Sequence, residues 1–421
     1  MTSAQAQPLF TNDAVVLGIL MAILGFVFYT SAIEKGFWKK FYSIVPTIFV
    51  IYFLPSIFTT LGIIPSEGSQ IYFVASRYLL PTSLVLLTLS IDLKGILRLG
   101  PKAIIMFLTG TLGIVFGGPI AILVMSVISP DTVGGGAGPD AVWRGMTTVA
   151  GSWIGGGANQ AAMKEVFEVG DQVFSAMVAV DIIAANVWMA FLLFCAGRWE
   201  SIDKWNGADS TAIVDLRERV ANYQASIARL PKLSDTMVVL GVGFSVTAFA
   251  HVGADVIAPA IEANLPQLDK FSLTSKFFWL VVIATTIGII LSTQEKVRAL
   301  EGVGASRLGS VLLYILVASI GMKMDLMAIF KNPEYFLLGG IWMAIHAILL
   351  LTVAKLIKAP VFFMAVGSQA NVGGAASAPI VASAFHPALA PVGVLLAVLG
   401  YALGTYGAWF CGQLMRVVSG G

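Results

Sequence analysis

Two glycine-rich segments carry the residue types best suited to bind an ion or a small solute. GSWIGGGANQAAM at 151–163 and GSQANVGGAASAP at 367–379 each interrupt a long apolar run. A glycine destabilises a helix interior by about 1 kcal/mol relative to alanine. Unwound backbone inside a bilayer persists only where it is buried in protein or lines a cavity. The segments therefore predict two broken helices, one interrupted at 155–157 and the other at 373–374.

Small polar side chains surround both predicted breaks. Freed carbonyl groups at a break can coordinate a cation, and the N–H groups of a half-helix attract an anionic ligand. Close packing of helices through small residues is the alternative, but two matching segments with side-chain amides favour a binding site. We predict ion ligands at Asn159, Gln160 and Gln369. The predicted substrate contacts are Ser152, Gly156, Gly157, Ser368, Asn371, Gly373, Gly374 and Ser377.

Asp181 lies near the middle of the apolar run AMVAVDIIAANVWMAFLL, which contains no basic residue. A carboxylate at bilayer depth is costly and usually marks an ion or proton pathway. The alternative is a carboxyl group that is protonated or hydrogen-bonded to a neighbouring helix. We predict that Asp181 binds Na⁺ or H⁺.

Other polar residues in or near apolar runs carry weaker predictions. His346 either pairs with a polar group on a neighbouring helix or relays protons. Arg77 is near the end of a run and is expected to extend toward the membrane surface. Glu165, Glu168 and Asp171 fall in a short connector and are expected to form a solvated turn.

The composition excludes several classes of protein. Of the 421 residues, 57% are hydrophobic and only 11% are charged, whereas soluble chains carry roughly 25% charged residues. Such a chain must expose apolar surface to lipid. Its few, scattered basic residues predict no nucleic-acid partner. Cys195 and Cys411 lie in apolar runs and are expected to be buried thiols. The sequence lacks a P-loop, a Cys/His metal spacing and a Ser/His/Asp set, so we predict neither an enzyme nor a cofactor beyond a coupling Na⁺.

The apolar runs predict an all-helical, polytopic membrane protein, since about 20 apolar residues span a bilayer core. Twelve runs are long enough or nearly so. They fall at 14–32, 43–63, 73–91, 103–128, 144–166, 172–197, 236–256, 276–293, 307–322, 334–356, 360–385 and 389–415.

The two halves of the chain share three motifs in the same order. An apolar run ends in Asp-Leu at Asp92 and again at Asp325, and a glycine-rich segment follows in each half. A further run then ends at Arg198 or Arg416. Chance similarity between apolar helices is the alternative, but the common order favours two structural repeats.

We accordingly divide the chain into three parts. Residues 1–197 form the first transmembrane repeat and residues 236–421 the second. The polar linker 198–235 lies between them and contains AIVDLRERVANYQASI, which predicts a surface helix.

Charged connectors give the expected orientation, because cytoplasmic loops are rich in Lys and Arg. This rule places the Asp92 connector inside and the Asp325 connector outside, which inverts the second repeat relative to the first. Twelve simple membrane crossings cannot place all of these connectors on their expected sides of the membrane. We favour inverted repeats with eleven or thirteen crossings; parallel repeats are the alternative.

The GGGANQAAM stretch, followed directly by the Asp181 run, resembles the bile acid–sodium symporter and cation–proton antiporter superfamily. Over essentially the whole chain the sequence is similar to the YjcL-like family of uncharacterised bacterial membrane proteins. The resemblance implies two broken helices that cross in a core domain, opposite a panel domain whose helices often pair in a homodimer.

The resemblance also implies roles for particular residues. A GG-x-x-S-N stretch supplies sodium ligands in the bile acid symporters, and Asn159 and Gln160 occupy the similar positions here. A Glu-x-x-x-Gln pattern supplies further ligands, but this chain has Ala365 in place of the glutamate and retains Gln369. Asp181 is similar in placement to the ion-binding aspartate of the antiporters and would supply the missing charge.

Together these patterns predict a secondary active transporter of the bacterial inner membrane. Its cargo would be a small organic anion, amino acid or short peptide, with transport coupled to Na⁺ or H⁺. A cation/proton antiporter is one alternative. A membrane-embedded enzyme or receptor is an alternative of a different class.

Overall fold

The computed structural model describes residues 8–42, 45–66, 68–134, 136, 138–209, 231–324, 332–386 and 389–420, and these residues form helices and loops without strands. The long helices are α1 (Asp13–Ser31), α3 (Thr47–Thr60), α5 (Leu80–Leu89), α7 (Pro101–Ile128), α9 (Val142–Val166), α10 (Asp171–Ala196), α13 (Leu233–Asn264), α14 (Lys276–Ser292), α16 (Ala305–Gly321), α18 (Glu334–Leu356), α19 (Val361–Val372), α20 (Gly374–Phe385) and α21 (Ala390–Val418). The shorter ones are α2 (Gly36–Tyr42), α4 (Ile71–Val74), α6 (Leu93–Arg98), α8 (Pro130–Val133), α11 (Trp199–Asn206), α15 (Glu295–Arg298), a π-helical turn at Ala75–Leu79, and 3-10 helices at Pro266–Phe271 and Ala299–Val303.

Each of the twelve predicted apolar runs contains helix among its described residues, which confirms the prediction of an all-helical protein. Within the described ranges, seven helices are long and apolar enough to cross a membrane, or up to nine if each of two bent pairs counts as one span. Large apolar side chains such as Phe26 on α1 and Phe116 on α7 are exposed. Lipid, rather than water, is the solvent that suits such a surface.

Local sequence explains where several helices begin. The Asn12 side chain accepts a hydrogen bond from the Ala14 N–H at the start of α1, and Ser275 accepts one from Phe278 at the start of α14. Pro101 opens α7, a position where the missing N–H costs nothing. The surface helix predicted from AIVDLRERVANYQASI and the Asp325–Leu326 pair lie outside the described residues.

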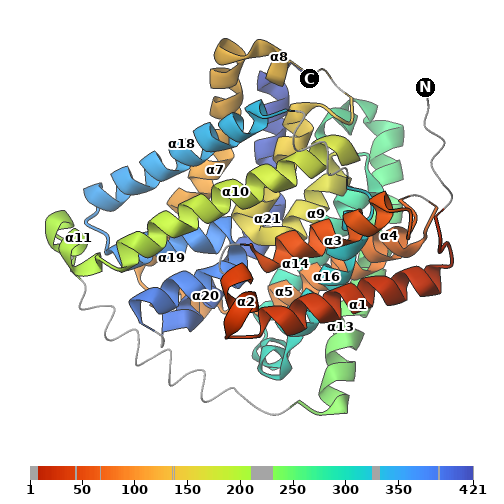
Figure 1. The fold of residues 1–421 in the computed structure, drawn as a ribbon, viewed down its shortest axis with the longest axis horizontal. Coiled ribbons are helices and arrows are strands. Elements are labelled where there is room, and N and C mark those ends of the chain that lie inside the picture. Colours follow the sequence, from red (N-terminus) through yellow and green to blue (C-terminus); the bar gives the residue numbers. More distant parts are fainter. Residues whose placement is uncertain are drawn as a thin grey trace.

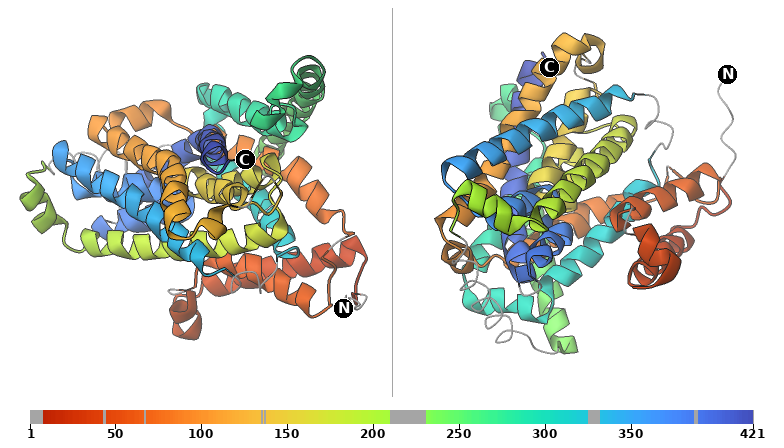
Figure 2. Two further views of the ribbon diagram at one scale, coloured as in Figure 1. Left: turned by 90° about the horizontal axis from the view of Figure 1, so that it is seen from above. Right: turned by 60° about the vertical axis from the view of Figure 1, so that its left-hand side comes forward.

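The helices form two sets that pack mainly within themselves (Figures 1 and 2). One set contains α7, α9, α10, α18, α19, α20 and α21, and the other contains α1, α3, α5, α13, α14 and α16. Figure 1 shows α18 and α10 lying side by side in the first set and α1 at the edge of the second. The sets touch where α5 and α14 contact α9 and α21.

Both predicted breaks are present. Gly156 interrupts α9 with φ 71° and ψ −173°, a conformation almost restricted to glycine. In the second segment α19 ends at Val372, and Gly374 has φ 57° at the start of α20. A Cβ placed on Gly374 would lie 3.6 Å from the Gly156 Cα. The two breaks therefore meet in the first set of helices.

Glycines on α21 allow this helix to lie against both breaks. A Cβ on Gly400 would be 2.7 Å from the Ile154 carbonyl oxygen, and one on Gly393 would be 2.6 Å from the Ala378 carbonyl. Close approach of backbones through small residues is typical of helices packed in membranes. The small residues of α21 thus hold the broken helices together and leave their polar side chains to make the contacts described below.

The short helix α11 forms hydrogen bonds with the end of α18, the connector after it and the start of α19. The buried Asp203 carboxylate accepts a hydrogen bond from the Val361 N–H at 2.7 Å, in the first turn of α19. The Asn206 amide donates to the Ala354 carbonyl at 3.3 Å and the Ala359 carbonyl at 2.8 Å. The linker therefore begins with a cap that fixes the start of the second broken helix.

Asp203 gives the stability a dependence on pH. Burial raises the pKa of its carboxyl group, and the hydrogen bond from Val361 opposes that rise. Because the folded-state pKa lies above the unfolded value of about 3.9, this group costs stability as pH rises through both values. Asp203→Asn keeps an oxygen for Val361 and removes the charge. We expect its gain in melting temperature over wild type to be larger at pH 7 than at pH 4. An equal or larger gain at pH 4 would contradict this account.

Candidate functional site

Asp181 is buried in the middle of α10 and receives hydrogen bonds on both carboxylate oxygens. Its Oδ1 accepts from the Trp153 indole at 2.7 Å, and its Oδ2 accepts from the Gln160 amide at 2.8 Å. The Ser152 hydroxyl is a third hydrogen-bonding neighbour. The predicted ion ligands Asp181 and Gln160 and the predicted substrate contact Ser152 therefore lie together.

The bend at Gly156 is what brings these donors to one carboxylate. Trp153 precedes the break in α9 and Gln160 follows it, so Asp181 binds both arms of the bent helix. The Tyr52 hydroxyl, from α3 in the other set of helices, donates to the Gln160 Oε1 at 3.1 Å. A chain of side-chain hydrogen bonds thus runs from α3 through α9 to α10.

The Asp181 carboxylate is held by neutral groups. Over the described part of the chain, no lysine or arginine forms an ion pair with it. Neutral donors orient a carboxylate but leave its charge uncompensated, and a buried charge is stabilised when a counter-charge joins it. A carboxylate has about four lone-pair sites and the three donors do not fill them all, so the geometry suits a proton or a small cation beside Asp181.

Asn159, the other predicted ion ligand of α9, uses its polar atoms to join α9 to α21. Its amide donates to the Gly155 and Tyr401 carbonyl groups, each at 3.1 Å. Its Oδ1 accepts from the Thr405 hydroxyl at 2.8 Å. The structure therefore places Asn159 as a connection between the break and α21, away from the hydrogen bonds of Asp181.

Gln369 and Ser377 lie together at the second break. The Gln369 amide donates to the Ser377 hydroxyl at 2.7 Å, and both approach the position of a Cβ on Gly373. The Gln369 Oε1 is buried and receives no hydrogen bond within the described residues. An acceptor in this state is suited to a cation or a donor group supplied from outside the chain.

Ser368 and Asn371 face the helices on the far side of α19. The Ser368 hydroxyl accepts from the Trp188 indole at 2.7 Å and lies 2.8 Å from the His346 Nε2. The Asn371 amide donates to the Phe107 carbonyl at 2.9 Å, and its Oδ1 accepts from Thr111 at 2.7 Å. These two predicted substrate contacts join α19 to α7, α10 and α18. His346 on α18 therefore pairs with a polar group on a neighbouring helix, which is the first of the two alternatives predicted for it.

Gly156 and Gly374 touch at the crossing, whereas a Cβ on Gly157 would meet only the Ile48 side chain, at 3.5 Å. The predicted residues therefore fall into three places: beside Asp181, at the second break, and in contacts between helices. Among the described residues, no group of three His, Cys, Asp or Glu side chains could hold a metal ion.

A second polar cluster lies where α9 meets α4 and the π-helical turn. The Arg77 guanidinium is 2.6 Å from the Glu165 carboxylate, and the Lys164 ammonium is 2.7 Å from Asp171. The Tyr72 hydroxyl donates to Glu165. The prediction of a solvated turn is therefore wrong for Glu165, which lies in α9 with 11% of its side chain exposed. A third of the Arg77 side chain is exposed, and its extension toward the membrane surface stays a prediction.

Sequence reasoning missed Tyr52 and Trp153 at the candidate site. Tyr52 lies in the aromatic run IYFLPSIF, where it looks like any core or lipid-facing aromatic. Trp153 is inside the first glycine-rich segment, and its indole N–H is a donor that needs a partner when buried. The requirement of the Trp153 indole for a hydrogen-bond partner was therefore the feature of the sequence that could have identified this residue.

These observations define the class: an all-helical, multi-pass membrane protein with two broken helices that meet beside a buried carboxylate. The chain belongs to the DUF819 family, described as "Protein of unknown function (DUF819)", whose family model matches residues 18–418. It is 25% identical over 397 residues to the "Uncharacterized membrane protein YjcL" of Bacillus subtilis (strain 168), a comparison that covers 92% of this chain and 95% of the relative.

Proposed function

We propose that this protein is a secondary active transporter that moves a small organic solute and couples its movement to Na⁺ or H⁺. One observation carries the proposal: Asp181 is buried at the bend of a broken helix and is held by neutral donors alone. A binding site that gains and loses a cation is the function that best suits an uncompensated carboxylate at this depth.

The two sets of helices supply the moving parts in this proposal. The set with the broken helices corresponds to the core domain of the bile acid–sodium symporter and cation–proton antiporter superfamily, and the other set corresponds to the panel. Inverted repeats would let the core rock against the panel and expose the site to each side in turn. The Tyr52–Gln160 hydrogen bond joins the two sets, and it would break and re-form during that movement.

Further parts of the proposal follow from the same reasoning. The basic connectors favour a bacterial inner membrane with these loops in the cytoplasm. Half-helix N-termini at the crossing favour a cargo with a carboxylate, such as an organic anion, amino acid or short peptide. Panel helices would pair in a homodimer, and no enzymatic role is proposed.

A cation/proton antiporter is the second candidate, and the position of Asp181 favours it as well. A carboxylate that exchanges a proton for a metal cation needs no organic cargo. Vesicles containing the purified protein would then exchange Na⁺ for H⁺ with salts alone. A requirement for an organic solute would exclude this candidate.

The decisive experiment is the melting temperature against NaCl, with KCl at matched ionic strength, for wild type and Asp181→Asn. A ligand at 100 times its dissociation constant stabilises the folded state by about 2.7 kcal/mol. We expect a Na⁺-specific or pH-dependent rise in wild type that is absent in Asp181→Asn. The control is Asp255→Asn, which removes an exposed carboxylate of α13 and should keep the full response. A response that survives in Asp181→Asn would reduce this residue to a structural role.

A further inference from the structure

The first glycine-rich segment turns back on itself. At the two ends of α9, the Arg144 guanidinium donates a hydrogen bond to the Phe167 carbonyl, and the Trp143 and Phe167 rings lie 6.0 Å apart. In a straight helix, residues 143 and 167 would be about 36 Å apart. The bend at Gly156 therefore makes α9 a helical hairpin, hairpin 1, with Gly156 at its tip.

The second glycine-rich segment has the same form. α19 and α20 are joined at Gly373, and near this joint the Gln369 amide donates to the Ser377 hydroxyl at 2.7 Å. At the far ends of the two helices, the Phe362 and Phe385 rings lie 5.3 Å apart. α19 and α20 thus run antiparallel and form hairpin 2. Its tip touches the tip of hairpin 1, since these tips are the two breaks that meet.

The open ends of the two hairpins lie at opposite ends of α10. This helix has 26 residues, enough for about 39 Å, and it begins at Asp171, directly after hairpin 1. Its other end leads into α11 (Figure 1), where Asp203 accepts a hydrogen bond from the Val361 N–H at the start of hairpin 2. Because a bilayer core is about 30 Å thick, the two open ends are far enough apart to reach opposite faces of a membrane.

Basic residues gather on the face to which hairpin 2 opens. Lys102, at the start of α7, donates to the carbonyl of Lys358, just before hairpin 2, at 2.8 Å. The connector before α7 begins at Ser90, which donates to Glu301 in the connector before α16 at 2.5 Å. This face therefore carries the basic stretches 94–102, 296–307 and 355–358. Such a face is typically the cytoplasmic one.

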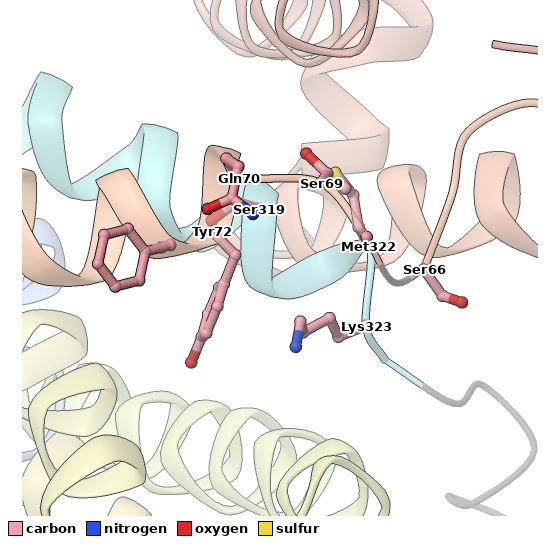
Figure 3. A pocket seen from close by; sticks show the side chains of 9 residues that line it. Ser66, Ser69, Gln70, Tyr72, Ser319, Met322 and Lys323 are labelled. Atoms are coloured by element: carbon pink, nitrogen blue, oxygen red, sulfur yellow. The ribbon is translucent and has the colours of Figure 1, made fainter. Parts of the chain in front are cut away.

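The other set of helices also reaches the face to which hairpin 1 opens. Tyr72, in α4, donates to Glu165 near the open end of hairpin 1. Ser319 and Met322, at the end of α16, lie beside Gln70 and Tyr72, as Figure 3 shows. α16 begins on the basic face and ends beside hairpin 1, so it runs from one face to the other.

Contacts with α5 give the directions of α13 and α14. α5 follows α4 and leads to α7, so it runs from the face of hairpin 1 to the basic face. On α13, Thr247 lies 2.8 Å from Thr82, and His251 lies 2.9 Å from the Arg77 carbonyl. α13 is therefore antiparallel to α5 and ends on the face of hairpin 1. α14 follows it and returns to the connector 293–304 on the basic face.

Each half of the chain then contains five crossings. α3 returns from the end of α1 to its start, where the Leu9 N–H donates to the Gly62 carbonyl at 2.8 Å. Over the described ranges, α3, α14 and α16 together with the seven long apolar helices give ten crossings. An odd number of crossings in the first half reverses the direction in which the second half begins, which inverts the second half relative to the first.

We propose that the chain crosses the membrane ten times and that its two glycine-rich segments are re-entrant hairpins, which enter from opposite faces and meet tip to tip. Hairpin 1 opens to the outside and hairpin 2 to the cytoplasm. Ten crossings replace the eleven or thirteen favoured by the sequence, and hairpins replace the crossing helices that the resemblance implies. This arrangement keeps the basic connectors in the cytoplasm and the Asp92 connector among them.

The proposal also divides the candidate site between the two faces. The donors to Asp181 belong to hairpin 1, whereas Gln369 and Ser377 join the arms of hairpin 2. Each half of the site is thus attached to a hairpin that opens to one face. A use of the hairpins in transport rests on the proposed function; the topology does not.

The test is the sidedness of single cysteines. Cys195 and Cys411 are both buried, so the wild-type protein should remain unlabelled by a membrane-impermeant maleimide. The reagent is applied to intact bacterial cells that produce the protein and to inverted vesicles prepared from them. Exposed residues lie at both ends of each hairpin: Gly138 and Gln172 for hairpin 1, and Lys358 and Ala384 for hairpin 2. We expect Gly138→Cys and Gln172→Cys to react only in cells, and Lys358→Cys and Ala384→Cys only in inverted vesicles.

Glu200→Cys is the matched control, because Glu200 is exposed beyond the far end of α10. It should react on the opposite face from Gln172→Cys, which shows that the assay resolves a true crossing. Glu168→Cys and Leu356→Cys are second reporters for a variant that does not reach the membrane. Reaction of the two ends of either hairpin on opposite faces would overturn the proposal, and so would reaction of both hairpins on the same face. None of these results depends on the Na⁺ response of Asp181.

Discussion

Replacing Gly151 with alanine is expected to destabilise the folded protein by about 3 kcal/mol, which is the upper end of the usual cost of overpacking a protein core. The chain turns so sharply at Gly156 that a Cβ on Gly151 would lie 2.5 Å from the Asn159 carbonyl oxygen and 2.9 Å from the Gln160 nitrogen. Both contacts are with backbone, so no rotamer change relieves them. The bend must open instead, and Gln160 would then move away from Asp181.

The measurement is the melting temperature in detergent, together with the Na⁺ response described above. Gly157→Ala is the matched control in the same segment, because its Cβ would meet only the flexible end of Ile48, at 3.5 Å. It should change stability by no more than about 1 kcal/mol. Equal melting temperatures for the Gly151 and Gly157 variants would show that the bend is not held as tightly as this geometry requires.

The breaks could be predicted from sequence because their signal is local. Glycine runs inside apolar helices are unusual, and their conformational consequence follows from the glycines themselves. The structure confirms it at Gly156 and Gly374, which both have positive φ. Nothing local, however, says which side chains meet when a helix bends. Gln160 reaches Asp181 and its neighbour Asn159 reaches α21, because adjacent residues point to different faces.

The second polar cluster, which contains Arg77 and Glu165, shows that the contacts of charged residues are equally hard to predict from sequence. Arg77 and Glu165 are 88 residues apart in the chain, and each looked like a surface residue when considered alone. Their pairing depends on how α4 and the π-helical turn pack against the end of α9. Residues near the ends of apolar runs are therefore the ones whose environment a sequence reveals least.

Asn159→Ala is the second change for which we expect a large effect, a loss of about 3 kcal/mol. The substitution removes three buried hydrogen bonds, to Gly155, Tyr401 and Thr405. A buried polar group left without its partner costs about 1–3 kcal/mol. Thr405→Val provides the matched control, because it removes the hydroxyl that donates to Asn159 and also contacts the Thr285 hydroxyl at 3.3 Å, and it should cost about 1 kcal/mol.

The Na⁺ response of Asn159→Ala separates two roles for this residue. The sequence predicts an ion ligand, whereas the structure uses each polar atom of Asn159 to hold α9 against α21. If the role is structural, the variant melts at a lower temperature but gains as much from Na⁺ as wild type does, and so does Thr405→Val. We expect this result. A Na⁺ response lost in Asn159→Ala and kept in Thr405→Val would instead place Asn159 among the ligands. The asparagine would then have to exchange its contacts with α21 for the ion, and the break itself would be the element that moves during transport.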